Sequence, residues 1–178
     1  SHVAVVPMIK FTHGDIFAAQ AQTLVNPVNC VGVMGKGLAK EFKTRFPDMN
    51  RDYVAACHRG EVRPGRPFIY RDLTRIILCF PTKDNWKEPS RYEFIEDGLE
   101  AIAGNYDAWG IQSMAIPPLG CGLGGLDWSK VKPLVVRFLG DLPIEIDVYQ
   151  PLAAAGAKEA QPTQATGRTA SREVGRPR

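Results

Sequence analysis

The sequence lacks any long apolar run, which leaves no segment able to span a bilayer as a helix. Its amino terminus, SHVAVVPM, lacks both the basic segment and the cleavage site of a signal peptide, so we expect none. The four cysteines include no CxxC pair, and no histidine stands at zinc-ligand spacing. We therefore expect reduced thiols, no metal, no cofactor, no membrane contact and a cytoplasmic location.

Excess charge is also missing from most of the chain. The 178 residues carry 22 Lys and Arg against 19 Asp and Glu. Residues 151–178 hold five of these basic and two of these acidic groups, so residues 1–150 are neutral as a whole. Net charge therefore gives no argument for nucleic-acid binding, which would have to rest on local clusters of basic residues.

The carboxyl-terminal stretch lacks aromatic residues and has little to bury. It reads PLAAAGAKEAQPTQATGRTASREVGRPR, and we expect 151–178 to be a disordered tail or a linker. Ser-His ahead of the first Met indicates that residues 1–7 are a cloning remnant. One domain is then expected over 8–150, and its modest size favours a monomer.

Short apolar runs alternate with amphipathic stretches across this domain, a pattern typical of a layered α/β fold. A hairpin around RDLT indicates that the sheet is mixed. No GxGxxG follows the first strand, which argues against a Rossmann dehydrogenase. Strands are expected at 8–11, 23–29, 67–70, 75–80, 113–119 and 144–150, and helices at 35–46, 50–59, 92–102 and from a Ser129 cap to 138.

Three loops follow expected strand ends, where open α/β sheets bind their ligands. They are 12-THGDIF-17, 25-VNPVNCVGVMGKGLAKEF-42 and 117-PPLGCGLGGLDW-128. The third has four glycines in six residues but no P-loop lysine or serine. Glycines at this density let backbone N–H groups turn toward an anion, and two such loops favour a ligand that contains phosphate.

Taken together, GDI after the first strand, NxxN followed by GxMGKGLAKEF, and GCGLGGLDW resemble the macrodomain family over about residues 8–150. Within that family, PVNCVGVMGKGLAKEF and PTK…PSRYE are similar to the DarG branch, the antitoxins of DarT–DarG systems, and to terminal ADP-ribose protein glycohydrolases. The resemblance implies a three-layer α/β/α sandwich that binds ADP-ribose. It also implies removal of ADP-ribose from thymidine bases of single-stranded DNA, with the cognate ADP-ribosyltransferase toxin as a partner.

The resemblance assigns ligand contacts that the residue types can make. Asp15 and the Ile16 amide would bind adenine, although Asp15 is also suited to cap a helix. Asn26 and Asn29 offer donors and acceptors to ribose, although asparagine is also common in turns. The backbones of the two Gly-rich loops would surround the distal ribose and the diphosphate, through Gly35, Lys36, Gly37, Gly120, Cys121, Gly122, Leu123, Gly124 and Gly125.

Lys83 is the candidate catalytic residue, because it stands just past a strand within a motif that matches the relatives' catalytic lysine. Lys87 is its rival in the same loop. Cleavage at ribose C1″ passes through an oxocarbenium-like state, and the base departs as an anion. Lys83 would either stabilise that anion as an ammonium or attack C1″ as an amine, and the sequence leaves both roles open.

One position departs from the relatives' pattern. Protein-directed relatives carry an aspartate directly after GCGL, where this chain has Gly124. This substitution argues against hydrolysis of ADP-ribose esters on acidic protein residues, although that activity stays an alternative, as does a module that binds ADP-ribose without hydrolysing it. Asp127, three residues on, is expected to cap the following helix.

Contacts to DNA would come from the local basic residues Lys40, Lys87 and Arg91. Trp86 lies among them in sequence and is suited either to stack on an exposed base or to cover the site as a lid.

Overall fold

The computed structural model describes residues 8–152. The expected cloning remnant at 1–7 and residues 153–178 of the tail expected at 151–178 lie outside them. One six-stranded sheet runs in the order β1-β6-β5-β2-β4-β3. Its neighbours pair in parallel except β3 and β4, so the predicted mixed sheet is confirmed. The strands are β1 (Ile9–Thr12), β2 (Thr23–Val28), β3 (Phe68–Arg71), β4 (Ile76–Pro81), β5 (Ser113–Ile116) and β6 (Glu145–Tyr149).

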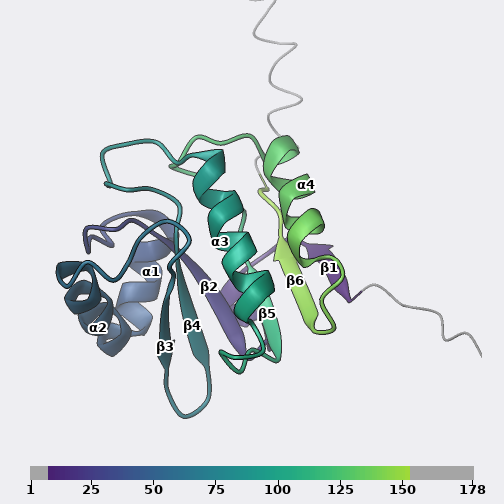
Figure 1. The fold of residues 1–178 in the computed structure, drawn as a ribbon, viewed down its shortest axis with the longest axis horizontal. Coiled ribbons are helices and arrows are strands. Elements are labelled where there is room, and N and C mark those ends of the chain that lie inside the picture. Colours follow the sequence, from purple (N-terminus) through teal and green to yellow (C-terminus); the bar gives the residue numbers. More distant parts are fainter. Residues whose placement is uncertain (1–7, 153–178) are drawn as a thin grey trace, which may run out of the picture.

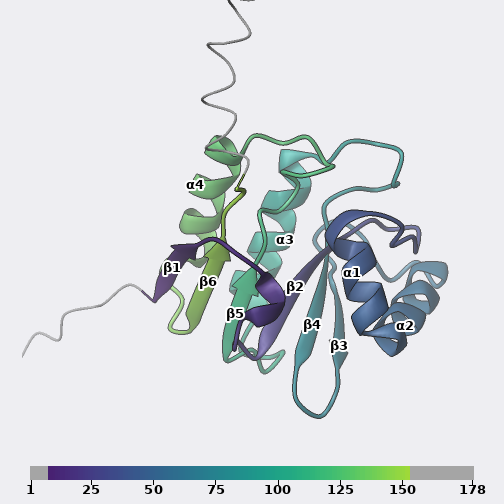
Figure 2. The same cartoon turned by 180° about the vertical axis from the view of Figure 1, so that it is seen from behind.

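Helices cover both faces of this sheet, which confirms the predicted three-layer sandwich. Helices α3 and α4 lie on the face nearer the viewer in Figure 1, and α1 lies on the opposite face, with α2 beside it (Figures 1 and 2). No helix within residues 8–152 combines the length and apolar character needed to cross a membrane. The helices are α1 (Gly37–Arg45), α2 (Pro47–His58), α3 (Tyr92–Asn105) and α4 (Trp128–Leu139), with a short 3-10 helix, η1 (Ile16–Ala18).

Strand β2 alternates its side chains between two apolar cores. Leu24 and Val28 pack with α1 and α2, whereas Val25 packs with α3 and α4. The second core is tight at Gly98, where an added Cβ would lie 2.2 Å from the Phe80 ring. Helix α3 therefore packs closely on β4 at this point.

Three differences from the predicted elements concern α2, α4 and η1. Helix α2 begins at Pro47 rather than near residue 50, because proline fits the first helical turn without losing a needed N–H donor. The cap of α4 is Asp127, whose carboxylate accepts from the Ser129 amide over 2.9 Å, so the cap expected at Asp127 is confirmed and the one expected at Ser129 is wrong. The single-turn helix η1 was not predicted as an element, although Asp15, which caps it, was noted as suited to cap a helix.

Candidate functional site

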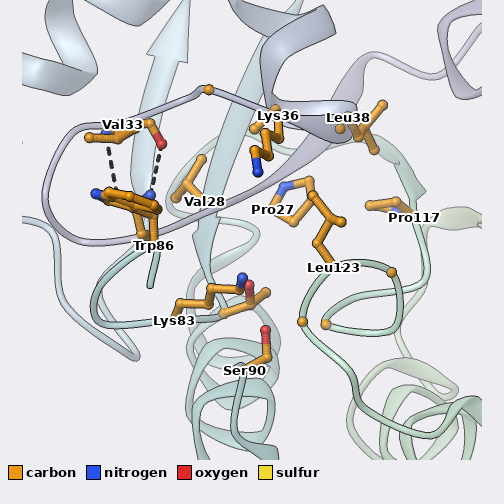
Figure 3. Close-up of a pocket in the computed structure, with 18 of the residues that line it drawn as sticks. Pro27, Val28, Val33, Lys36, Leu38, Lys83, Trp86, Ser90, Pro117 and Leu123 are labelled. Atoms are coloured by element: carbon orange, nitrogen blue, oxygen red, sulfur yellow. Dashed lines mark hydrogen bonds between the residues drawn. The ribbon is translucent and has the colours of Figure 1, made fainter. Parts of the chain in front are cut away.

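A cavity of about 650 Å³ opens at the carboxyl ends of β2, β4 and β5. Three segments border it: the 29–36 loop after β2, the 82–91 segment after β4, and the 117–127 loop after β5. These strands are neighbours in the sheet, so segments far apart in sequence converge at one edge. Figure 3 shows Lys83 and Ser90 on one side, Lys36 across from them, and Val33 with Trp86 facing Leu123 and Pro117.

Asn29 organises the first loop from inside. Its Oδ1 atom accepts from the amides of Val31, Gly32 and Val33 at 3.1, 3.1 and 3.3 Å, and its Nδ2 atom donates to the Val33 carbonyl oxygen at 2.7 Å. The Tyr53 hydroxyl of α2 lies 2.7 Å from the Asn29 carbonyl oxygen and 3.0 Å from Oδ1. The Asn29 side chain lines the cavity, but most of its hydrogen-bonding capacity holds the loop.

Lys83 follows β4 at the border of the cavity, and the first loop is bonded to its segment. The Cys30 amide donates to the Asp84 carbonyl oxygen at 3.0 Å, and the Cys30 thiol donates to the Lys83 carbonyl oxygen at 3.5 Å. Burial, with a contribution from the Asp84 charge, raises the pKa of Cys30 to about 12, so the thiol stays a neutral donor at neutral pH. The backbone that carries Lys83 is thereby held by two hydrogen bonds from Cys30.

The start of α3 holds the third loop. The Ser90 amide donates to the Gly124 carbonyl oxygen at 3.1 Å, and the Asp127 amide donates to the Tyr92 hydroxyl at 3.0 Å. Gly120 has a φ of 74°, which favours glycine, and its carbonyl oxygen accepts from the Leu126 amide at 2.9 Å. The loop is thus closed on itself and tied to the helix behind it.

Gly124 leaves no room for a side chain. An added Cβ would lie 2.1 Å from Ser90 Oγ and 2.6 Å from the Gly120 carbonyl oxygen. A carboxylate-bearing residue at position 124 would therefore need this loop and Ser90 to rearrange. Glycine at position 124, where protein-directed relatives carry an aspartate, therefore fits the space that this loop leaves.

The cavity is apolar at its rim and positive inside. Leu123, Trp86 and Val33 are 68, 50 and 41% exposed, and the Leu123 side chain lies against Gly37 across the opening. Lys36 and Lys83 are the charged residues among those that line the cavity, and no acidic side chain faces them there. Unopposed cations beside glycine-rich backbone favour an anionic ligand with apolar parts.

The cavity gathers most of the predicted site residues and leaves several out. Those lining it are Asn29, Gly35, Lys36, Gly37, Lys83, Trp86, Gly120, Gly122, Leu123 and Gly124. Those outside the lining are Asp15, Ile16, Asn26, Lys40, Lys87, Arg91, Cys121 and Gly125.

Three of the residues outside the lining have another visible role. Asp15 caps η1, accepting from the Phe17 amide at 2.9 Å. Asn26 is fully buried, and its amide lies 3.6 Å from the Met34 sulfur and 3.8 Å from the Cys79 sulfur. Lys40 borders a smaller cavity beside α1, together with Thr44 and Arg45. Their ligand contacts stay predictions.

Two hydroxyl side chains in the lining, Thr82 and Ser90, were not among the predicted site residues, and each is 4% exposed. Thr82 directly precedes Lys83, and Ser90 lies two residues before α3. Only the fold shows that both reach one cavity. Within residues 8–152, no group of three or more His, Cys, Asp or Glu side chains is arranged to hold a metal ion.

Comparison with known proteins supplies the family context of this site. A model of the family described as "Macro domain" matches residues 25–135. A DNA ADP-ribosyl glycohydrolase of Thermus aquaticus is 44% identical over 150 residues, which cover 82% of this chain and 42% of that relative. A DNA ADP-ribosyl transferase-DNA ADP-ribosyl glycohydrolase fusion protein of Thermosipho africanus is 41% identical, covering 81% of this chain and 42% of the fusion.

A solved structure agrees with these matches. It is described as Thermosipho africanus DarTG in complex with ADP-ribose, and it superposes with a TM-score of 0.78 at 43% identity, covering 81% of this chain and 42% of that one. The chain thus spans less than half the length of the curated relatives that it matches first.

Proposed function

The chain belongs to the Macro domain family, and from that premise we propose that it removes ADP-ribose from thymidine bases of single-stranded DNA. As a DNA ADP-ribosyl glycohydrolase it would act as the antitoxin of a DNA-modifying ADP-ribosyltransferase. A cytoplasmic location and a direct contact with that toxin are parts of the same proposal. The name of the Thermosipho relative, which joins transferase and glycohydrolase in one protein, supports the pairing.

The observation that carries this proposal is Lys83 at the border of a cavity that holds two cations and no carboxylate. The diphosphate of ADP-ribose matches the unopposed positive charge and the amide-rich loops around Gly35–Gly37 and Gly120–Gly124. The distal ribose would then lie near Lys83, with C1″ and its attached base toward the opening.

The reaction breaks the bond between ribose C1″ and a thymine nitrogen. The bonding electron pair stays with the nitrogen, and C1″ becomes an oxocarbenium ion. Water adds through its oxygen to C1″ and loses a proton, while the base gains one proton from solvent. An ammonium group at Lys83 favours this path because it stabilises the negative charge that develops on the leaving base.

An amine at Lys83 would instead attack C1″ and form an adduct that water later hydrolyses. Reductive trapping followed by mass spectrometry separates the two roles. A covalent adduct of the sugar on Lys83 would be detected only if Lys83 attacks C1″ as an amine.

DNA would reach the site across the apolar rim. Trp86 stands at the opening, and the Lys87 Nζ atom lies 5.3 Å from the centre of its ring, where it holds a positive charge near the stacking surface. Lys40 and Arg91 lie outside the cavity and are suited to contact phosphates of the same strand. Since residues 1–150 are neutral as a whole, we expect binding to rest on these few groups.

The proposal is tested by giving the protein two substrates that carry ADP-ribose through different bonds. One substrate is a single-stranded oligonucleotide with one ADP-ribosylated thymine, and the other is a protein ADP-ribosylated on glutamate. We expect ADP-ribose release from the DNA and little from the protein, because Gly124 provides no carboxylate for ester hydrolysis. Release from the protein alone would make the chain a protein-directed hydrolase. Tight ADP-ribose binding without release from either would make it a reader.

A further inference from the structure

Ser90 carries a buried hydroxyl for which the fold provides no partner. The residue is 4% exposed, its Oγ atom is inaccessible, and no hydrogen bond reaches that atom. Leaving a buried hydroxyl unpaired destabilises the native state. Unpaired groups of this kind are rare in native structures and often mark a functional site.

The surroundings of this hydroxyl belong to the reaction end of the cavity. Ser90 lines the same cavity as Lys83, and in Figure 3 its oxygen points toward that lysine. Gly124 packs beside this hydroxyl, and a Cβ added at position 124 would collide with Oγ. Ser90 therefore uses the space that a side chain at position 124 would need.

A hydrogen bond holds the backbone of Ser90, whereas none holds its side chain. The Ser90 amide donates to the Gly124 carbonyl oxygen at 3.1 Å, which fixes the main chain. Rotation about χ1 moves Oγ between staggered positions. Turning toward the cavity breaks no hydrogen bond, because the hydroxyl makes none in its present position.

We propose that the Ser90 hydroxyl turns into the cavity and donates a hydrogen bond to a carbonyl oxygen of the departing base, on the same side of the cavity as Lys83. No proton is transferred and no bond to Ser90 forms. The hydrogen bond strengthens as negative charge develops on the base, so it acts on turnover more than on ADP-ribose binding. This inference rests on the proposed DNA glycohydrolase activity and names a second polar group for it.

The test is Ser90→Ala, which removes the hydroxyl and leaves the backbone contact with Gly124 in place. Ser129→Ala is the matched control, because it removes a hydroxyl that is bonded to Asp127 outside the cavity. Three quantities are measured for each variant: the single-turnover rate on ADP-ribosylated single-stranded DNA, the Kd for free ADP-ribose, and the thermal midpoint.

We expect Ser90→Ala to slow the single turnover by about 100-fold, as for the loss of one donor to a developing anion. The Kd for ADP-ribose should change by less than about twofold, since the hydroxyl acts on the base and not on the sugar nucleotide. The thermal midpoint should not fall, because alanine removes an unsatisfied group. Ser129→Ala should leave turnover unchanged.

Three results would overturn the inference. If wild type cleaves the DNA substrate and Ser90→Ala cleaves it as fast, Ser90 takes no part in the reaction. If the ADP-ribose Kd rises in step with the loss of turnover, Ser90 serves ligand binding instead. If wild type leaves the DNA adduct intact, the proposed function and the role of Ser90 within it both fail.

Discussion

The Cys30 thiol donates a hydrogen bond to the backbone carbonyl oxygen of Lys83 over 3.5 Å. This contact joins the Asn29 loop to the segment that carries the candidate catalytic lysine. It depends on a protonated sulfur, and burial keeps the sulfur protonated by raising the pKa of Cys30 to about 12. The geometry behind Lys83 is thus linked to the protonation state of a neighbouring thiol.

A first prediction concerns alkaline pH. The ordinary pKa of a cysteine thiol is 9.0, and the native value for Cys30 is raised. Between those two pKa values the unfolded chain releases the Cys30 proton and the native chain keeps it. The free energy of unfolding therefore falls as pH rises above about 9. Urea unfolding of wild type and Cys30→Ser from pH 8 to 11 measures this, with a shallower decline expected for the serine variant. Identical slopes would contradict it.

A second prediction concerns the support of the Asn29 loop. Tyr53→Phe removes the hydroxyl that lies 2.7 Å from the Asn29 carbonyl oxygen and 3.0 Å from Oδ1. Because the ring is fully buried and keeps its packing, the loss is that of the hydrogen bonds alone, about 1–3 kcal/mol in free energy of unfolding. The Kd for ADP-ribose should rise as the loop loosens. Unchanged stability in urea would show that this hydroxyl does not hold the loop.

A third prediction uses two glycines of one loop. Gly124→Ala places a Cβ 2.1 Å from Ser90 Oγ, whereas Gly122→Ala meets no atom within 4 Å. The first variant should lose about 1–3 kcal/mol of stability through overpacking, and the second should lose almost none. Thermal unfolding of both variants decides the matter. Equal losses would mean that the loop adjusts freely around Ser90.

A fourth prediction separates two roles for Trp86, which is half exposed at the rim. If Trp86 stacks on a base, Trp86→Ala weakens binding to single-stranded DNA by about 1–3 kcal/mol and leaves the affinity for free ADP-ribose unchanged. We expect this result, measured by fluorescence anisotropy and calorimetry. A parallel loss of ADP-ribose affinity would identify Trp86 as a lid instead.

The sequence predicted where the site lies better than it predicted which atoms face it. Lys83 and the Gly-rich loops follow strand ends, and strands that are neighbours in a sheet bring their ends together. The alternation of β2 turns Asn26 toward Met34 and Cys79, and its contact with ribose stays a prediction. Sequence position alone did not reveal that direction before the sheet was known.

Other features depend on contacts between distant segments. Ser90 matters because Gly124, 34 positions along the chain, packs on its hydroxyl, and no local pattern encodes such a contact. Asp15 and Asp127 are the reverse case, since a carboxylate next to a helical turn predicts a cap from local geometry alone. Short-range chemistry was readable from the sequence, and long-range packing was not.

The central claim is that Lys83 performs the chemistry at this cavity, and its most direct test compares Lys83→Ala with Lys87→Ala. Both variants remove a lysine from one segment, but only Lys83 lines the cavity. A gel assay follows conversion of a single-stranded oligonucleotide carrying one ADP-ribosylated thymine to the unmodified strand. We predict that Lys83→Ala slows conversion by about 100-fold or more while still binding ADP-ribose, and that Lys87→Ala converts the strand at saturation nearly as wild type does. Rapid conversion by Lys83→Ala would contradict the account.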